Sequence, residues 1–256
     1  MSLNVARKLS AALLLVLVAA PAQSQGLTTR QADDILKELR GIRQALERLS
    51  PPPGARQPVA PTAPAPFPSV RMLTVGGRVL GRADAPLTMV EFTDLQCAYC
   101  ARFHATTFQR IKAEYIDTGL VRYVTRDFPL DMLHQNADLA ARASRCAGEQ
   151  DHFWDVRTTL VTNADKLTPE FVTATAQRSN LDMQTFHACL DSVQTREGVQ
   201  RDLAEGRAVG VEGTPTFIVG KTESEGLNGV RMVGNMPFEI FDAKFKELLA
   251  QGALKR

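Results

Sequence analysis

Two cysteines separated by two residues, Cys97 and Cys100, constrain the fold of this chain more than any other feature. They follow an apolar run, Leu87 to Phe92, after four intervening residues, and they precede a segment with a helical pattern, Ala101 to Asp117. In a strand-to-helix turn, this spacing places the first thiol at the helix N-terminus, where free backbone N–H groups and the helix dipole favour a thiolate. The second thiol lies one turn further on, close enough to form a reactive disulfide. The pattern predicts a redox-active dithiol.

A zinc site is the alternative interpretation of such a cysteine pair, because structural zinc is bound by four thiolate or imidazole ligands. That site would need a second pair of ligands at close spacing. The other cysteines, Cys146 and Cys189, lie far apart in the sequence, and the histidines form no cluster with ligand spacing. We therefore expect a redox dithiol, with no metal and no other cofactor.

Strand-like and helical segments alternate from residue 70 to the C-terminus. An almost continuous apolar run, such as Leu87 to Phe92, is typical of a central strand buried on both faces. The expected elements are a hairpin of 70–74 and 79–80 around Gly76-Gly77, a strand at 87–92, a helix at 101–117, a strand at 120–127, helices within 132–208, strands at 216–219 and 230–233, and a helix at 237–249. This order predicts an α/β thioredoxin-like fold in 70–256, with an inserted helical domain at about 130–208.

Residues 1–24 have the pattern of a secretory signal peptide. Arg7 and Lys8 precede an apolar run, Leu9 to Ala20, and small residues suited to cleavage follow. An uncleaved membrane anchor is the disfavoured alternative, because a spanning helix needs about 20 apolar residues. Export would bring all four cysteines into a compartment where disulfides persist. We therefore expect a periplasmic protein.

An amphipathic, coiled-coil-like helix is predicted in residues 25–50. Its apolar residues recur in alternating steps of three and four residues, which is the spacing of a coiled-coil seam. The main members of this stripe are Ile35, Leu39, Ile42 and Leu46. The alternative is a helix that packs on its own catalytic domain. The proline-rich linker, 51–69, argues against that alternative, because proline-rich segments act as stiff spacers. We therefore expect a homo-oligomer formed through residues 27–49.

Several short motifs stand in a familiar order along the chain. They are Asp84-Ala85-Pro86, Val90-Glu91-Phe92-Thr93-Asp94, Cys97-Ala98-Tyr99-Cys100, Phe128-Pro129-Leu130 and Gly213-Thr214-Pro215-Thr216. Together they resemble the DsbA-like thiol:disulfide oxidoreductases, exported enzymes with a thioredoxin fold. The resemblance covers residues from about 70 to the C-terminus. Many relatives have proline in place of Ala98. The two residues between the cysteines, Ala98 and Tyr99 here, tune the stability of the thiolate in this family.

The resemblance and the helix position together assign roles to the residues around the dithiol. Cys97 is expected to be the nucleophile, on the exposed side of the turn, and Cys100 the more buried resolving cysteine. Pro215 precedes a strand and is expected to form a cis peptide bond in a loop beside the dithiol. Thr214 is expected to contact the sulfurs. Tyr99 is expected to contribute to the surface that substrates contact.

Glu91 is a carboxylate within an apolar strand, and such groups are rarely buried without a partner. We interpret it as a buried proton acceptor for Cys100, with a pKa raised by loss of solvent. The alternative is a glutamate at a strand end that faces water or a lysine. His104 lies one helical turn after Cys100, and we expect it to face solvent.

Cys146 and Cys189 both fall in the predicted helical insertion. In an exported chain, the two remaining cysteines most simply pair with each other as a structural disulfide. A second redox-active relay is the alternative.

The leading functional hypothesis is an enzyme that forms or reshuffles disulfides in exported client proteins, with a membrane redox partner. The competing hypothesis is a non-catalytic redox-sensing or metal-handling adaptor that uses the same cysteine pair. Only the enzyme needs a proline loop beside the sulfurs to hold a peptide. The net charge of +2 gives no indication of nucleic-acid binding. Oxidase and isomerase remain open, and the predicted oligomer favours the isomerase.

Overall fold

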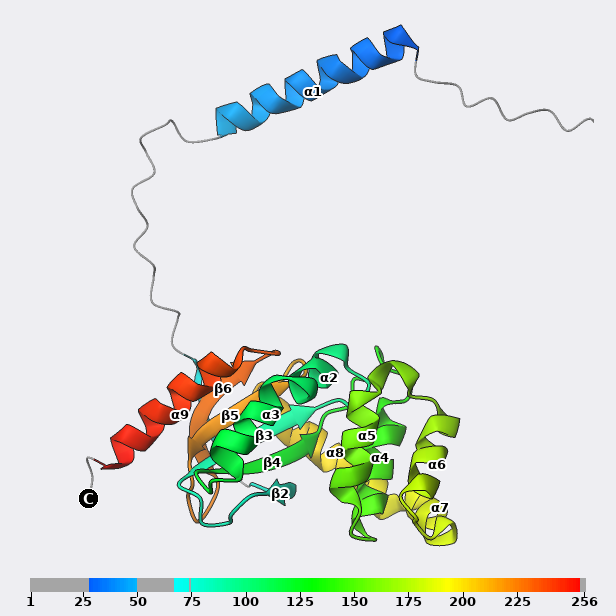
Figure 1. Ribbon diagram of the computed structural model, residues 1–256, viewed down its shortest axis with the longest axis vertical. Coiled ribbons are helices and arrows are strands. Elements are labelled where there is room, and N and C mark those ends of the chain that lie inside the picture. The colour runs from blue at the N-terminus through cyan, green and yellow to red at the C-terminus, as the bar shows by residue number, and fades with distance from the viewer. Residues whose placement is uncertain (1–27, 50–66, 74, 254–256) are drawn as a thin grey trace, which may run out of the picture. The chain divides into compact units, whose positions relative to one another are not determined.

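The computed structural model describes residues 28–49, 67–73 and 75–253 (Figure 1). The chain divides into two units, Met1–Pro64 and Ala65–Arg256. The expected signal peptide, 1–24, lies outside the described residues, as does nearly all of the expected linker, 51–69. None of the helices in the described part of the chain is long and apolar enough to cross a membrane.

The described part of the first unit is one helix, α1 (Thr29–Leu49). A reciprocal cap begins it, in which the Gln31 backbone N–H donates to Thr28 Oγ1 (3.3 Å) and the Thr28 N–H donates to Gln31 Oε1 (3.0 Å). The apolar stripe predicted from the sequence remains about half exposed, with 46% for Ile35, 55% for Leu39 and 54% for Ile42.

The second unit is built on a six-stranded mixed sheet with the order β1-β6-β5-β3-β4-β2. The strands are β1 (Ser69–Met72), β2 (Arg78–Leu80), β3 (Leu87–Thr93), β4 (Val121–Asp127), β5 (Thr216–Lys221) and β6 (Leu227–Val233). Strands β3 and β4 pair in parallel, and the other neighbouring strands pair antiparallel. The expected hairpin of 70–74 and 79–80 is wrong, because β1 pairs with β6 and β2 pairs with β4 at the opposite edge.

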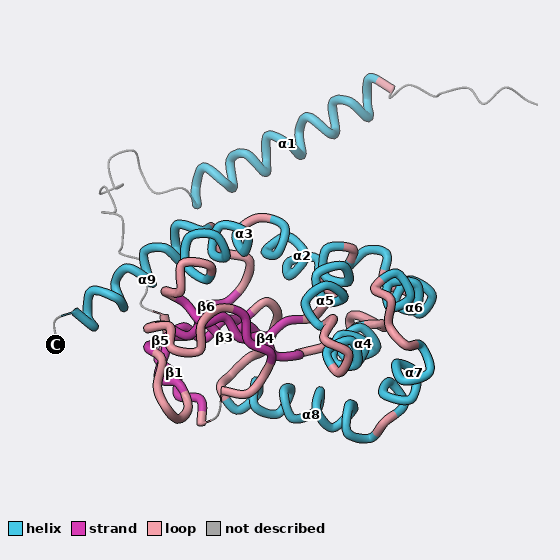
Figure 2. The backbone as a smooth tube through the Cα atoms, turned by 60° about the horizontal axis from the view of Figure 1, so that its bottom comes forward, coloured by secondary structure: helices cyan, strands magenta, loops and turns pink. Residues whose placement is uncertain are grey.

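Helices cover both faces of this sheet (Figures 1 and 2). They are α2 (Ala98–Ala105), α3 (Thr107–Ile111), α4 (Ala137–Gly148), α5 (Phe153–Thr162), α6 (Pro169–Arg178), α7 (Met183–Asp191), α8 (Val193–Ala208) and α9 (Phe238–Ala253), with a π-helical turn η1 (Lys112–Ile116) and a 3-10 turn η2 (Ala164–Lys166). The single helix expected at 101–117 is wrong. The helix begins earlier, at Ala98, and is interrupted at Thr106, whose backbone leaves the helical region (φ −124°, ψ −83°).

Alternation of side chains along the strands divides the core into two layers. One face carries Met89 and Phe217, which pack against Phe103 of α2 and Phe241 of α9. The other face carries Val90, Phe92 and Val124, which pack against the apolar side of α8. Figure 2 shows α8 along this face of the sheet. Strand β3 is buried along its whole length, as its apolar sequence predicts.

Helices α4 to α8 follow β4 and precede β5, and they form the predicted helical insertion. In Figure 1, α4, α5, α6 and α7 lie together beyond the end of the sheet from which α2 starts. Contacts between α2 and α5 join this insertion to the thioredoxin-like part of the fold. The helical insertion therefore borders the turn that carries the two cysteines.

Candidate functional site

The dithiol lies in the turn between β3 and α2. Cys97 is the N-cap residue of α2, with an extended backbone (φ −75°, ψ 123°), and its carbonyl accepts a bond from the Ala101 N–H (3.0 Å). Cys97 is 5% exposed and Cys100 is fully buried, and both are free thiols. The expectation of an exposed nucleophile is met only in part, because Cys97 is itself largely covered.

The Cys97 sulfur is an acidic thiol. The Cys100 thiol donates a hydrogen bond to it, and with the backbone N–H groups of Tyr99 and Cys100 this outweighs burial and lowers the pKa of Cys97 to about 5. These N–H groups belong to the first turn of α2, where no helical carbonyl is available to them. The helix start therefore stabilises a thiolate at this position.

Cys100 has the opposite character. Burial raises its pKa well above the usual value for a thiol, and both the hydrogen bond to Cys97 and the charge of Glu91 act in the same direction. At neutral pH the reduced dithiol therefore holds one thiolate, on Cys97, and one proton, on Cys100.

The loop before β5 lies against the first cysteine. The Thr214–Pro215 peptide bond is cis, and Cys97 Sγ lies 3.5 Å from the Thr214 carbonyl oxygen, to which it can donate only when Cys97 is protonated. Tyr99 is 63% exposed on the surface beside the dithiol. No three His, Cys, Asp or Glu side chains of residues 28–49, 67–73 and 75–253 are grouped closely enough to hold a metal ion.

A buried polar cluster lies beneath Cys100. His104 Nε2 contacts Glu91 Oε1 and Oε2 at 3.1 and 3.0 Å, and the Tyr123 hydroxyl donates to Glu91 Oε2. Arg157 Nη2 donates to Glu91 Oε2 (3.2 Å) and to the Tyr123 hydroxyl oxygen (3.3 Å). All four residues are buried. The carboxylate of Glu91 therefore has three partners, which come from α2, β4 and α5.

The expectation that the pKa of Glu91 is raised is wrong. Burial acts in that direction, but the contacts with His104, Arg157 and Tyr123 outweigh it and lower the pKa to about 2. Glu91 is therefore an ionised carboxylate at neutral pH, and it is a weak proton acceptor there. Its negative charge acts on Cys100 by raising the pKa of that thiol.

The expectation that His104 faces solvent is also wrong. His104 is buried, and burial lowers its pKa although Glu91 opposes this shift. The imidazole is therefore neutral at neutral pH, and its Nε2–H donates to Glu91. A histidine on the same helix face as Cys100, four residues later, could have indicated this placement.

Arg157 and Tyr123 also contact Glu91, and neither was expected from the sequence. Arg157 lies on the apolar face of α5 with Phe153, Val156 and Leu160, and a cation at such a helix position indicates a buried anionic partner. Tyr123 is positioned by the parallel pairing of β3 with β4, which a single sequence does not reveal.

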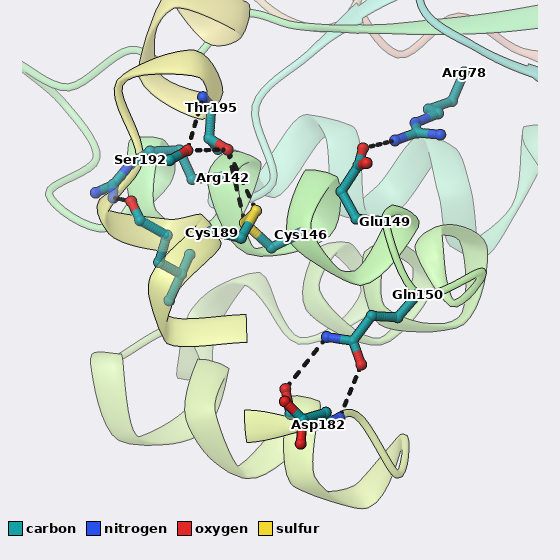
Figure 3. Close-up of a disulfide and its surroundings, with 10 residues drawn as sticks. Arg78, Arg142, Cys146, Glu149, Gln150, Asp182, Cys189, Ser192 and Thr195 are labelled. Carbon is teal, nitrogen blue, oxygen red and sulfur yellow. Dashed lines mark hydrogen bonds and ion pairs between the residues drawn. A yellow bond between two sulfur atoms is a disulfide. The ribbon is translucent and has the colours of Figure 1, made fainter. Parts of the chain in front are cut away.

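The other two cysteines form a disulfide, Cys146–Cys189, that joins α4 to α7. Cys146 is fully buried in an apolar cluster, and Cys189 is partly buried. In Figure 3 the Thr195 hydroxyl points toward both sulfurs, at 3.3 Å from Cys189 Sγ and 3.9 Å from Cys146 Sγ. A reductant would attack Cys189, the more accessible sulfur, and Cys146 would then leave as a thiolate. Apolar surroundings disfavour a thiolate, so this disulfide resists reduction, which favours a structural role.

Residues 73–233 match the family model described as thioredoxin. A probable disulfide bond formation protein D of Bacillus cereus is 32% identical over 149 residues, which are 55% of this chain and 68% of that protein. A Na(+)/H(+) antiporter NhaA of Herminiimonas arsenicoxydans is 38% identical over 156 residues, which are 60% of this chain and 24% of the antiporter. This chain therefore spans about a quarter of the length of that antiporter.

Two solved structures have a similar fold. Wolbachia pipientis alpha-DsbA1 superposes with a TM-score of 0.63 at 25% identity, over 69% of this chain and 92% of that one. Oxidised BdbD from Bacillus subtilis superposes with a TM-score of 0.62 at 25% identity, over 72% of this chain and 98% of that one. The chain therefore belongs to the thioredoxin family and, within it, to the DsbA-like thiol:disulfide oxidoreductases.

Proposed function

We propose that this protein is an exported enzyme that forms or reshuffles disulfides in other exported proteins. The observation that carries this proposal is the contrast between the two thiols. Cys97 has a pKa lowered to about 5 at the N-cap of α2, whereas the pKa of Cys100 is raised. A dithiol with one stable thiolate is stabilised in its reduced form, so its disulfide form is an oxidant.

In the oxidising direction, a client thiolate attacks Cys97 Sγ of the Cys97–Cys100 disulfide. The bond between Cys97 and the client forms as the Cys97–Cys100 bond breaks, and Cys100 leaves as a thiolate and takes up a proton. A second client thiolate then attacks the client sulfur of the mixed disulfide and releases Cys97 as a thiolate. The client loses two electrons and two protons, of which one proton remains on Cys100 and the other enters solvent.

In the isomerising direction, the reduced Cys97 thiolate attacks a client disulfide and forms the same mixed disulfide. Either a client thiolate or Cys100 then resolves it. Tyr99, Thr214 and Pro215 are proposed to contact the client, because Tyr99 is exposed and the Thr214 carbonyl lies beside Cys97. Glu91 is proposed to act as the fixed negative charge beneath Cys100.

Export is supported by the signal-peptide pattern of residues 1–24 and by the Cys146–Cys189 disulfide, since such bridges persist in oxidising compartments. We propose a periplasmic location, client proteins that carry thiols or disulfides, and a membrane redox partner that resets the dithiol. Membership of the DsbA-like group favours this enzyme over a redox-sensing or metal-handling adaptor.

Self-association through residues 27–49 is a further part of the proposal. The half-exposed stripe of Ile35, Leu39 and Ile42 on α1 supports it, because an exposed apolar stripe favours association. Several dithiols on one assembly would act on one client at high effective concentration, which favours isomerisation.

The test is an exchange assay with the purified mature protein. Oxidised protein should restore activity to a reduced disulfide-containing client, and reduced protein should rescue a scrambled one if it is an isomerase. The reduction potential, measured against glutathione, assigns the preferred direction. If neither form exchanges disulfides with a client or with glutathione, the proposed function is wrong.

A further inference from the structure

Arg157 carries a permanent positive charge to a buried position beneath the dithiol. It lies on α5, in the helical insertion, and its side chain is only 3% exposed. One guanidinium nitrogen, Nη2, lies 3.2 Å from Glu91 Oε2, 3.2 Å from His104 Nε2 and 3.3 Å from the Tyr123 hydroxyl oxygen. An insertion helix therefore supplies a charged group to a cluster whose other members belong to the thioredoxin-like part of the fold.

Charge balance in this cluster depends on Arg157. The titratable groups that face the guanidinium are Glu91 from β3, Cys100 and His104 from α2, and Tyr123 and Asp127 from β4. His104 and Tyr123 are neutral at neutral pH, because burial lowers the pKa of the imidazole and raises that of the phenol. Asp127 has its own partner, Arg145, whose Nε lies 2.5 Å from Asp127 Oδ2. Arg157 is therefore the cation that balances Glu91.

We propose that Arg157 is a positioning residue for the dithiol: it keeps Glu91 ionised without a bound proton, so that the buried cluster does not titrate while Cys97 and Cys100 are oxidised and reduced. This inference rests on the redox function proposed above. The helical insertion then has a second role: besides covering the dithiol, it supplies the cation that balances the buried carboxylate of Glu91.

Loss of the guanidinium has a definite consequence. Burial raises the pKa of an isolated carboxyl, and Arg157 also lowers the pKa of His104. Without Arg157, the Glu91–His104 pair should therefore take up one proton as the pH falls through the working range. When this proton is absent, the negative charge of Glu91 is no longer balanced. It then repels the thiolate of Cys97 and so disfavours the reduced dithiol.

A purely structural role is the alternative, because breaking a buried ion pair destabilises a fold whatever its location. Arg126 offers a matched control. Its side chain is also 3% exposed and it is paired with a carboxylate, since its Nε lies 2.6 Å from Asp202 Oδ1. Neighbouring side chains of a strand point to opposite faces, so Arg126 and the Glu91 partner Tyr123 lie on opposite faces of β4.

The experiment measures the equilibrium of the full-length mature protein with glutathione between about pH 5 and about pH 9, a span that covers carboxyl and imidazole titration in buried sites. The variants are Arg157→Met, Arg157→Lys, Arg126→Met and the double variant Glu91→Gln/Arg157→Met. At the alkaline end, Arg157→Met should lower the equilibrium constant for reduction of the dithiol about tenfold, or about 30 mV. This difference from the wild type should disappear toward the acid end.

The other variants distinguish loss of the Arg157 charge from loss of packing around a buried arginine. Arg157→Lys should restore the wild-type pH profile, and the double variant should show no cluster titration because it lacks the carboxylate. Arg126→Met should lower the melting temperature without changing the potential. The inference is overturned if folded Arg157→Met has the wild-type pH profile, or if Arg126→Met changes it equally. If the wild type exchanges no disulfides at all, the proposed function fails instead.

Discussion

The sulfur of Cys97 lies 3.5 Å from the backbone carbonyl oxygen of Thr214, a contact between residues that are 117 positions apart in the sequence. Cys97 is also the N-cap residue of α2, so it lies between a helix start and the loop that precedes β5. A client peptide bound at Cys97, as proposed above, would therefore lie beside Thr214 and Pro215. The Cys97 sulfur is therefore next to the surface that is proposed to bind the client.

The two cysteines of the dithiol should have different roles. Cys97→Ser should abolish exchange, because it removes the attacking sulfur, whereas Cys100→Ser should accumulate mixed disulfides with clients, because it removes the resolving sulfur. Trapped complexes are detected by non-reducing electrophoresis, with the double serine variant as the control. A Cys97→Ser variant that traps clients through Cys100 would reverse the assignment.

The thiolate of Cys97 should titrate with a midpoint near pH 5, since its pKa is lowered to about 5 from 9.0. A lowered pKa stabilises the folded reduced protein above the unfolded-state pKa, and this stabilisation is lost as the pH falls from about 9 to about 5. Thiolate absorbance and the melting temperature of reduced protein against oxidised protein measure the two effects. A midpoint near the ordinary thiol value would contradict the role of the α2 N-terminus, and Cys97→Ser should lack the titration.

Glu91 should contribute to acid stability. Its pKa is lowered from 4.5 to about 2, so its stabilising effect is complete above about pH 4.5 and is lost as the pH falls toward 2. Glu91→Gln should flatten the dependence of the unfolding free energy on pH in this window. It should also destabilise the neutral protein by about 3–5 kcal/mol, because it leaves the buried Arg157 charge unpaired.

Denaturant unfolding at several pH values measures both effects of Glu91→Gln. Arg157→Met combined with Glu91→Gln is the control, since the unpaired cation is then removed. A Glu91→Gln variant with the wild-type slope would show that the carboxyl does not titrate in the predicted window.

The Cys146–Cys189 disulfide should be structural. Replacing both cysteines by serine should lower the unfolding free energy by about 3–4 kcal/mol in the chain-entropy model, given the separation of 43 residues. Thermal unfolding measures this loss, and labelling of Cys97 should proceed at the wild-type rate. Loss of client turnover in a variant that remains folded would support the relay alternative.

The stripe on α1 should drive self-association. Leu39→Asp/Ile42→Asp should give a smaller species by sedimentation, because charge replaces two half-exposed apolar side chains. Isomerisation of a scrambled client should weaken, whereas oxidation of a simple thiol should not. Lys37→Asp is the matched control, because Lys37 lies about 200° around the helix from Ile35. A wild-type protein that sediments as a monomer would remove this part of the proposal.

The sequence by itself predicted the thioredoxin-like fold and the helical insertion, and it indicated Cys97 and Cys100 as the candidate dithiol. These predictions depend on local patterns. The spacing of Cys97 and Cys100, the apolar run of β3 and the helical periodicities each involve residues that are close together in the sequence. The edge strands were predicted wrongly for the same reason. Residues close in sequence suggested a hairpin of β1 and β2, but the sheet pairs each with a distant strand.

Only the tertiary structure decided the charge state of the buried groups beneath the dithiol. Glu91, His104, Tyr123 and Arg157 come from β3, α2, β4 and α5, and no local pattern brings them together. Burial alone predicts a raised pKa for Glu91, which is the expectation that failed. The sign of the shift depends on which partners surround the carboxylate, and these partners meet only when the helical insertion packs against the sheet.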